Sequence, residues 1–468
     1  MKKYLVVLFI TLVGLPACMV GPNYQKPVVT VPVEFIYDTV EKDTVLNLRW
    51  WELFHDPQLV TLIDTALKNN KDVLIAASRV EEARLVVGYT KADQWPSIGY
   101  NGNASRTNID LNGNSGNAVN SFSALGNINW EIDFWGKYRR ATESAKADLL
   151  ASQYAQRAVQ ISLISEVAYT YFILLDFQAR LEISRQTLNS RQEGLSIMKS
   201  KFEYGTIPEI DLNQAEIQEA IAASAVPFFV RAVSQTEHAL RILLGENPGP
   251  IVHLGKLIDE QAPEIPAGIP SELLKRRPDV MQAEYLLAAQ NARIGVAQAM
   301  RFPTISLTGV LGVASGDLTN ILSSPAWSLG GGLTGPIFNF GKNKRRVDIE
   351  KQRTEQAVLY YEKAILQSLR EVEDALVEIH TLEQELDARI KQKNAAENAA
   401  ILSRERYNEG VTSYLEVLDS DRSNFDAELA AAETYQKYLN AHINLYKALG
   451  GGWISELEEQ QATENLQK

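Results

Sequence analysis

A seven-residue repeat of apolar side chains, present twice, constrains the fold of this 468-residue chain more than any other feature. Such a repeat makes α-helices pack side by side with a left-handed supercoil. The sequence therefore predicts long helices that pack as coiled coils. The first series is Val167, Leu174, Leu181, Leu188, Leu195 and Phe202, and the second, interrupted only at Lys393, is Val358, Ile365, Val372, Ile379, Leu386, Ala400 and Tyr407.

The two series belong to an internal duplication. They lie 205 residues apart (372 − 167 = 205), and Gly205 has the same spacing from Gly410. A helix of about 67 residues rises about 100 Å at 1.5 Å per residue, far more than the helices of compact domains. The duplication overrides the prior of about three compact domains for a chain of this length. We predict an elongated, duplicated coiled-coil fold.

Composition excludes several classes of function. A formal net charge of −12 and a pI near 5.2 argue against nucleic acid as a partner. No apolar run of 18 or more residues follows residue 20, which disfavours a protein anchored by transmembrane helices. No catalytic set or phosphate-binding glycine loop is present, so we predict a non-enzyme without cofactor or metal, driven by a partner. The five histidines match no metal-ligand spacing: His55, His238, His253, His380 and His442.

The N-terminus has the pattern of a secretory signal peptide over residues 1–17. Lys2 and Lys3 precede an apolar run, and Cys18, the only cysteine of the chain, follows it. The segment resembles a bacterial lipobox, in which the cysteine becomes the lipidated first residue of the mature protein, and Met19 after it favours the outer membrane in such lipoproteins. The alternative is an ordinary signal peptide with an incidental cysteine.

Two stretches change from a helical period to a period of two, which predicts β-hairpins at 97–134 and 303–339. Strands of about ten residues with one apolar face fit a membrane-spanning β-barrel, with a soluble sheet covered by a helix as the alternative. Four strands cannot close a barrel in lipid, so closure requires other chains. The apolar sets are Ile98, Tyr100, Gly102 and Ala104; Phe122, Ala124, Gly126, Ile128, Trp130, Ile132 and Phe134; Ile305, Leu307, Gly309, Leu311 and Val313; and Trp327, Leu329, Gly331, Leu333 and Ile337.

Aromatic side chains cluster where each predicted hairpin meets its helices. They suit a girdle at a membrane interface, and packing at a strand–helix corner is the competing explanation for about half of them. They are Trp95, Trp130, Phe134, Trp135, Phe302, Phe338 and Phe340.

These patterns divide the chain into consecutive segments. Pro227 lies inside the first return helix, where it predicts a kink. The predicted organisation is a signal peptide at 1–17; an extended arm at 18–55; repeat 1 at 56–245, with a helix, the hairpin 97–134 and a long helical hairpin at 137–245; an inter-repeat segment at 246–270; repeat 2 at 271–452, with a helix, the hairpin 303–339 and a helical hairpin at 342–449; and a tail at 453–468.

Several longer motifs resemble the TolC-like outer membrane factor family, in its NodT/OprM-type branch of efflux lipoproteins. They are the segments 18–24 (CMVGPNY), 50–57 (WWELFHDP), 270–280 (PSELLKRRPDV), 302–307 (FPTISL) and 450–453 (GGGW). The resemblance implies a homotrimer whose twelve strands form one outer-membrane β-barrel, continued by a periplasmic α-helical barrel. It also implies a periplasmic adaptor, an inner-membrane efflux pump and outer-membrane lipid as partners, and a lipid-anchored location extending into the periplasm.

The resemblance implies an outer-membrane duct that passively conducts small molecules for a tripartite efflux system. A duct for type I protein secretion shares the architecture and stays an alternative. A non-conducting structural coiled-coil lipoprotein would explain the heptads and Cys18 but not the four alternating strands.

The closed duct of the family narrows where the long helices turn back. Threefold symmetry would turn each carboxylate there into a ring that favours cations, and an apolar residue into a constriction; the alternative is a set of solvated tip residues. The candidates are Asp211, Leu415, Glu416 and Asp419 for the gate; Tyr407, Arg406 and Arg422 for a latch that joins neighbouring helices; and Gly205, Thr206, Gly410, Val411 and Thr412 for tips that contact the adaptor.

Basic residues also open each long helix, where the helix dipole disfavours cations. We expect them to contact lipid phosphates, with plain solvation as the alternative. They are Lys137, Arg139, Arg140, Lys342, Lys344 and Arg345.

Overall fold

The computed structural model describes residues 19–36, 54–108, 118–252, 255–263 and 270–451. The signal peptide, Cys18 and the C-terminal tail lie outside these ranges. The chain divides into two units. The first consists of residues 1–29, 78–153 and 282–363, and the second of residues 30–77, 154–281 and 364–468.

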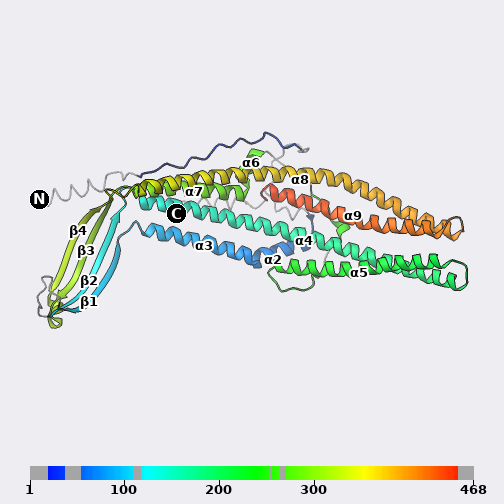
Figure 1. Ribbon diagram of the computed structural model, residues 1–468, viewed down its shortest axis with the longest axis horizontal. Coiled ribbons are helices and arrows are strands. Elements are labelled where there is room, and N and C mark those ends of the chain that lie inside the picture. The colour runs from blue at the N-terminus through cyan, green and yellow to red at the C-terminus, as the bar shows by residue number, and fades with distance from the viewer. Residues whose placement is uncertain (1–18, 37–53, 109–117, 253–254, 264–269, 452–468) are drawn as a thin grey trace. The chain divides into compact units, whose positions relative to one another are not determined.

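The order of helices and strands occurs twice along the chain (Figure 1). The two longest helices, α4 and α8, have 67 residues each, which confirms the predicted duplication of a coiled-coil unit. The first copy has α2 (Pro57–Asn69), α3 (Lys71–Ala92), β1 (Ser97–Thr107), β2 (Val119–Ile132), α4 (Lys137–Glu203) and α5 (Glu209–Leu243). After η2 (Leu257–Asp259), the second has α6 (Pro270–Arg276), α7 (Pro278–Ala299), β3 (Thr304–Ser315), η3 (Leu318–Ser323), β4 (Pro325–Thr334), α8 (Lys342–Asn408) and α9 (Tyr414–Ala448).

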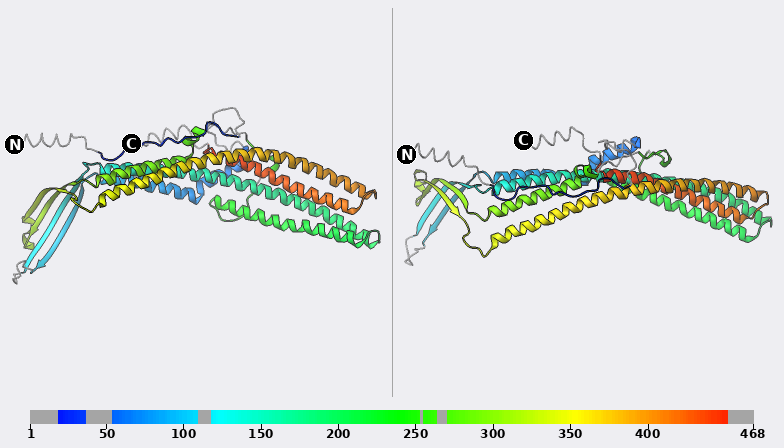
Figure 2. Two further views of the ribbon diagram at one scale, coloured as in Figure 1. Left: turned by 45° about the horizontal axis from the view of Figure 1, so that its top comes forward. Right: turned by 90° about the horizontal axis from the view of Figure 1, so that it is seen from above.

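Each long helix folds back on a return helix about half its length, α5 after α4 and α9 after α8 (Figure 2). Helix α5 is continuous from Glu209 to Leu243 with Pro227 inside it.

The four strands form one antiparallel sheet in the order β1-β2-β3-β4, so β2 and β3 join the two repeats. Its apolar side chains are uncovered: Tyr100 is 93% exposed, Leu329 82% and Trp327 76%. These side chains do not pack on a helix, which argues against the soluble-sheet alternative. An uncovered apolar face is what a strand needs where it faces lipid.

One strand is shorter than predicted. β4 ends at Thr334, because Gly335 and Pro336 follow and proline has no backbone N–H to donate to a neighbouring strand. Ile337 therefore lies outside the sheet, fully exposed.

The aromatic residues divide between the two explanations. The Trp135 indole donates to the Pro303 carbonyl at 2.8 Å, and its ring stacks on Phe302 at 4.4 Å, so these two are corner contacts. Trp95 and Phe340 are 68% and 85% exposed, as side chains of an interface girdle would be.

The second unit contains the main apolar core. Helix α4 has an 18-residue window apolar enough to cross a membrane, with a mean hydropathy of 1.5, but 56% of that window is buried inside the protein. Val167 and Leu174, on the heptad series, are fully buried there against Leu59 of α2 and Leu439 of α9. Burial of a Leu or Val side chain stabilises a fold by about 1.5–3 kcal/mol, so this window is explained as a core helix.

Beside this core lie two carboxyl groups, the half-buried Asp56 and the buried Glu260. Asp56 caps α2 by accepting from the Gln58 amide at 2.7 Å, and it also accepts a hydrogen bond from the Tyr171 hydroxyl. Glu260 is only 5% exposed, and its Oε2 has no hydrogen-bond partner. Burial, together with the charges of Asp56 and Asp259, raises the pKa of the Glu260 carboxyl to about 8.

This pKa makes stability depend on pH. The folded chain holds the Glu260 proton more tightly than the unfolded chain, so the free energy of unfolding falls as the pH rises from the ordinary pKa of 4.5 to about 8. We expect Glu260→Gln, which has no proton to lose, to reduce the fall in Tm measured between about pH 5 and about pH 8.5. Glu182→Gln, at an exposed position of α4, should keep the wild-type fall. An equal fall in Glu260→Gln would contradict the assignment.

In the first unit, contacts between helices follow the order α3, α4, α7, α8. Gln94, just after α3, donates to Thr142 of α4 at 2.8 Å. Arg293 of α7 pairs with Asp148 of α4 at 2.8 Å, and Gln290 of α7 donates to Glu350 of α8 at 2.6 Å. The outermost helices are therefore α3 and α8, as the outermost strands are β1 and β4 (Figure 1).

The N-terminal arm is bound to the beginning of α4 by Arg140. This guanidinium is 1% exposed and donates to the carbonyl oxygens of Val20 (3.1 Å) and Gly21 (3.1 Å) and to Oδ1 of Asn23 (2.9 Å). It also pairs with Glu143 at 2.8 Å.

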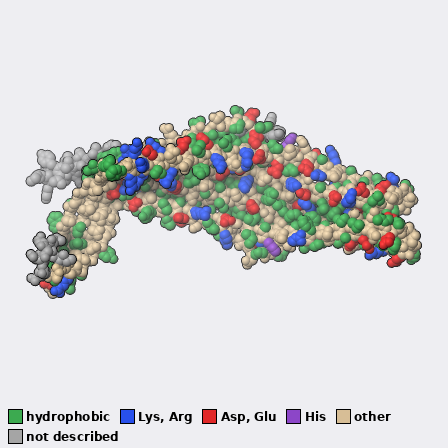
Figure 3. Space-filling model, in the orientation of Figure 1, with side chains coloured by type: hydrophobic (Ala, Val, Ile, Leu, Met, Phe, Trp, Pro, Cys, Tyr) green, Lys and Arg blue, Asp and Glu red, His purple; other side chains and the backbone are tan. Residues whose placement is uncertain are grey.

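The lipid-phosphate prediction is therefore wrong for Arg140, whose guanidinium is buried against the arm. Arg140 binds the arm, while Lys137 pairs with Glu131 at 2.7 Å and Arg139 with Asp133 at 3.2 Å. In the second repeat, Lys342, Lys344 and Arg345 are exposed, and Figure 3 shows Lys and Arg side chains gathered where the helices begin.

We expect Arg140→Ala to lower the free energy of unfolding by about 2 kcal/mol, because the part-buried carbonyls of Val20 and Gly21 lose charge-assisted hydrogen bonds. The arm should also become cleavable by protease after residue 18. Arg139→Ala, which removes a neighbouring ion pair without touching the arm, is the matched control. If the arm of Arg140→Ala stays as protected as that of the control, Arg140 does not hold it.

Candidate functional site

The two helical hairpins turn back at equivalent glycines. Gly205 and Gly410 have φ of +69° and +78°, a conformation that side chains rarely adopt. After each glycine an amide closes the helix end: Thr206 donates to Lys201 at 2.9 Å, and Val411 to Arg406 at 2.9 Å. The turn residues predicted as tips are largely exposed, with Val411 at 63%.

The second tip contains most of the predicted gate. Leu415 is 61% exposed. Glu416 lies 3.7 Å from Arg406 and accepts a hydrogen bond from the Thr412 hydroxyl. Asp419 pairs with Arg422 at 2.6 Å, one turn along the same helix. The structure thus joins each of these two acids to a predicted latch arginine inside one hairpin.

The first tip contributes only one predicted gate residue. Asp211 lies in the first turn of α5, part-buried, and its amide donates to the Pro208 carbonyl at 3.1 Å. The contacts of Glu416 and Asp419 do not extend to it.

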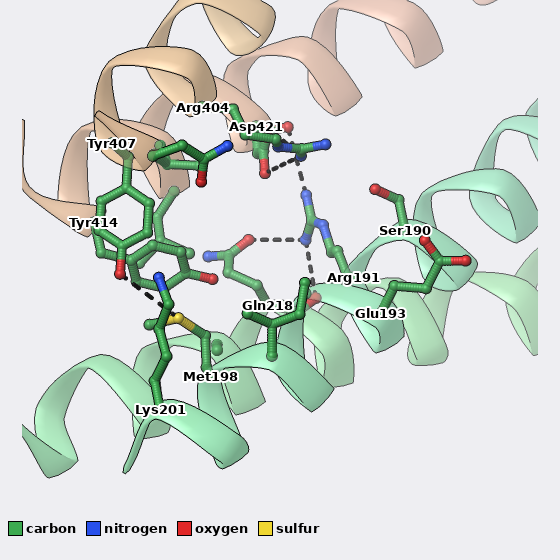
Figure 4. A pocket seen from close by; sticks show the side chains of 16 residues that line it. Ser190, Arg191, Glu193, Met198, Lys201, Gln218, Arg404, Tyr407, Tyr414 and Asp421 are labelled. Carbon is green, nitrogen blue, oxygen red and sulfur yellow. Dashed lines mark hydrogen bonds and ion pairs between the residues drawn. The ribbon is translucent and has the colours of Figure 1, made fainter. Parts of the chain in front are cut away.

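Tyr407 connects the two hairpins. Its hydroxyl lies 3.8 Å from the Met198 sulfur of α4, and the Lys201 ammonium lies 4.7 Å from its ring centroid. The ring of Tyr414 packs against it at 5.3 Å. These side chains line a cavity of about 210 Å³ between α4, α5, α8 and α9 (Figure 4).

At the inner end of this cavity lies Arg191, which the sequence analysis missed. It is 9% exposed and donates to the carbonyl (2.9 Å) and Oε1 (2.8 Å) of Gln218 on α5, and to the Asp421 carbonyl on α9 at 3.5 Å. Its guanidinium also lies 5.4 Å from the Phe425 ring centroid. Burial lowers the pKa of Arg191. Figure 4 shows it between the two hairpins.

Two further residues complete this contact. Arg404 pairs with the Asp421 side chain at 2.9 Å, so Asp421 accepts from Arg191 through its backbone and from Arg404 through its carboxylate. One observation could have revealed Arg191: it lies three residues after Leu188 of the heptad series, at the second apolar position of a coiled coil.

Comparison with known proteins agrees with this architecture. The sequence pattern of the outer membrane efflux protein family matches residues 62–246 and 269–451, once in each repeat. The solvent efflux pump outer membrane protein SrpC of Pseudomonas putida is 35% identical over 458 residues, or 94% of this chain and 97% of SrpC. The cation efflux system protein CusC of Escherichia coli O6:H1 is 35% identical over 455 residues, or 95% and 98%. The crystal structure of the Campylobacter jejuni CmeC outer membrane channel superposes with a TM-score of 0.87 at 28% identity, covering 96% and 98%.

The duplicated strand and helix hairpins define an outer-membrane channel protein, a class of ducts rather than enzymes. More particularly, the chain belongs to the outer membrane efflux protein family, which confirms the resemblance seen in its motifs. It is an outer-membrane duct for efflux that spans the outer membrane and the periplasm.

Proposed function

We propose that three copies of this chain form one duct, which passively carries small molecules from an inner-membrane pump and a periplasmic adaptor to the outside. The single observation that carries the proposal is the sheet: within the described part of the chain it has four strands, is apolar on an uncovered face, and leaves β1 and β4 unpaired at its edges. Unpaired backbone groups are costly in lipid, so further copies must close the sheet. Twelve strands lie within the range of known membrane barrels.

The names of relatives bear on the cargo. SrpC is a solvent efflux protein and CusC a cation efflux protein, and this chain matches both at 35% identity. The duct therefore takes cargo that its pump selects, either apolar compounds or cations. It has no catalytic activity of its own in this proposal.

The tips serve as the periplasmic entrance. Exposed residues at the turns, Gly205, Thr206, Gly410, Val411 and Thr412, contact the adaptor. Leu415, Glu416, Asp419 and Asp211 form rings around the threefold axis, and Tyr407, Arg406 and Arg422 hold the closed state. The pairing of Glu416 and Asp419 with arginines inside the α8–α9 hairpin supports a tip that is stable in the closed state.

The mature chain is lipidated on Cys18. Two or more acyl chains anchor a protein stably, and the barrel adds its own insertion. Cys18→Ser is expected to abolish palmitate labelling while some trimer still reaches the outer membrane. Labelling equal to that of the wild type would exclude Cys18 as the modified residue.

The partners can be tested in the native host. Affinity purification of the tagged full-length chain after in-cell cross-linking should recover one adaptor and one inner-membrane pump. A deletion strain should accumulate the pump's substrate, and the wild-type gene should restore its export. Val411→Asp at the exposed tip should reduce adaptor recovery without loss of trimer. Export restored by a chain that recovers no adaptor would contradict the tripartite assembly.

A further inference from the structure

The cavity between the two helical hairpins holds a buried positive charge that packing does not explain. Arg191 is 9% exposed, and its hydrogen bonds go to neutral oxygens of Gln218 and to the backbone carbonyl of Asp421. Within the described part of the chain, Asp421 and Asp426 act on its charge without forming an ion pair with it. Burying a charge that is not paired is costly, so a further partner for Arg191 is expected.

The internal duplication shows that the hairpin fold does not require this cation. At the spacing of 205 residues, Arg191 of α4 corresponds to Ala396 of α8 (191 + 205 = 396). Tyr414, which lines the cavity at the start of α9, corresponds to Glu209 at the start of α5 (414 − 205 = 209). Helices α4 and α8 both have 67 residues, so the alanine serves a helix of the same length. The arginine and the tyrosine therefore belong to the cavity and not to the general plan of a hairpin.

Lys201 supplies a second cation to the same cavity. Its ammonium lies 4.7 Å from the Tyr407 ring centroid and pairs with no carboxylate among the described residues. Figure 4 shows its side chain extending from α4 toward the tyrosine rings. The acids of the lining are Asp421, whose carboxylate pairs with Arg404 at 2.9 Å, and Glu193, which is exposed. Three cations against two acids leave the lining with a net charge of +1 (3 − 2 = 1).

A free hydroxyl and an apolar floor complete the lining. The Tyr414 hydroxyl donates to no other side chain among the described residues, and burial raises the pKa of Tyr414, so the hydroxyl keeps its proton. Met198, Val417 and Leu418 line the same space and are 2%, 3% and 7% exposed. An apolar cavity of about 150 Å³ holds benzene, so a cavity of about 210 Å³ has room for one ring and a small charged group.

We propose that this cavity binds a small aromatic carboxylate between the two hairpins. The ring packs on Met198 and Leu418, and the carboxylate accepts charge-assisted hydrogen bonds from Arg191 and from the Tyr414 hydroxyl. Lys201, ten residues further along α4, adds attraction at longer range. The ligand thus joins α4 to α9. Its effect on the channel rests on the proposed duct: a ligand that binds only when the hairpins are together favours the closed state.

Benzoate is the probe, added to the purified full-length protein in a calorimeter. Acetate, which has the carboxylate without the ring, and benzyl alcohol, which has the ring without the charge, are the matched compounds. We expect saturable binding of benzoate, and affinities at least about tenfold lower for the other two, because each lacks half of the interactions. Equal affinity for benzyl alcohol would overturn the assignment of an anion.

Two substitutions locate the site without removing Arg191, whose loss weakens the fold. Tyr414→Phe keeps the ring and should lower the affinity for benzoate about tenfold, the usual effect of losing a hydrogen bond to a charged group. Lys201→Gln should lower it by a smaller factor. Lys199→Gln is the control, because Lys199 is exposed on the same helix and pairs with Glu216 at 3.8 Å, away from the cavity lining. Benzoate affinities equal to the wild-type value in both Tyr414→Phe and Lys201→Gln would overturn the site.

The effect on the channel is measured in planar bilayers. Benzoate should lower the open fraction of the wild type, and the same concentration should have less effect on Tyr414→Phe. A trimer that conducts but binds no benzoate would overturn the site and leave the duct proposal intact. A trimer that binds benzoate and never conducts would contradict the duct proposal and leave the site intact. Binding that leaves the open fraction unchanged would overturn the closing effect.

Discussion

Replacing Glu416 with glutamine and Asp419 with asparagine is expected to convert the duct from cation preference to anion preference. The two carboxylates pair with Arg406 and Arg422 inside the same hairpin, so their neutralisation leaves both arginines uncompensated. Around a threefold axis this exposes six cationic groups at the entrance. A change of about 1 kcal/mol in the energy of the permeating ion alters the permeability ratio about fivefold. The measurement is the reversal potential in a KCl gradient.

The arginines of the same pairs supply the matched control. Arg406→Gln with Arg422→Gln leaves Glu416 and Asp419 uncompensated, and we expect stronger cation preference and higher conductance. If the reversal potential shifts in opposite directions in the two double variants, the ion-selective entrance lies at this tip. Unaltered reversal potentials in both variants, with the trimer intact, would place the constriction elsewhere.

The second large effect is expected from Arg191→Met. The substitution keeps an unbranched side chain but leaves the part-buried Gln218 Oε1 and two carbonyl oxygens without their donor. We expect a loss of about 2–3 kcal/mol in the free energy of unfolding. Since Arg191 joins α4 to both α5 and α9, the two hairpins should also separate more easily, and the fraction of time that the channel is open should rise.

Arg404→Met is the matched control for Arg191→Met. It removes a half-exposed ion pair to the side chain of Asp421 and leaves the Arg191 contacts in place. Exposed pairs contribute about 0.2–1 kcal/mol, so its effect on Tm should be small. If Arg191→Met lowers Tm but leaves the open fraction at the wild-type value, Arg191 is a packing residue and not part of the latch.

The periodic parts of the fold were predictable from sequence because their cause is local. Heptad spacing predicted the long helices, and an alternation of period two predicted all four strands. The error at Ile337 has a local cause as well, since Gly335 and Pro336 end β4 whatever alternation follows them. Burial of Val167 and Leu174 shows that the heptad series marks core positions, although Phe202 near the tip is 39% exposed.

The contacts that were missed join segments far apart in the sequence. Arg140 was assigned to lipid phosphates, but its partner Val20 lies 120 residues earlier, and no local pattern connects them. Arg191 contacts Asp421 across 230 residues. A charged residue at a coiled-coil core position indicates that a partner exists; the fold alone shows which one.

Single-channel recording of the purified full-length protein in planar bilayers tests the central claim most directly. A trimeric duct predicts discrete conductance steps with cation preference, and an open fraction that rises in Arg191→Met while the protein stays trimeric. A protein that is trimeric and inserted in the bilayer, yet gives no steps either as wild type or as this variant, would contradict the duct. It would favour the non-conducting structural lipoprotein instead.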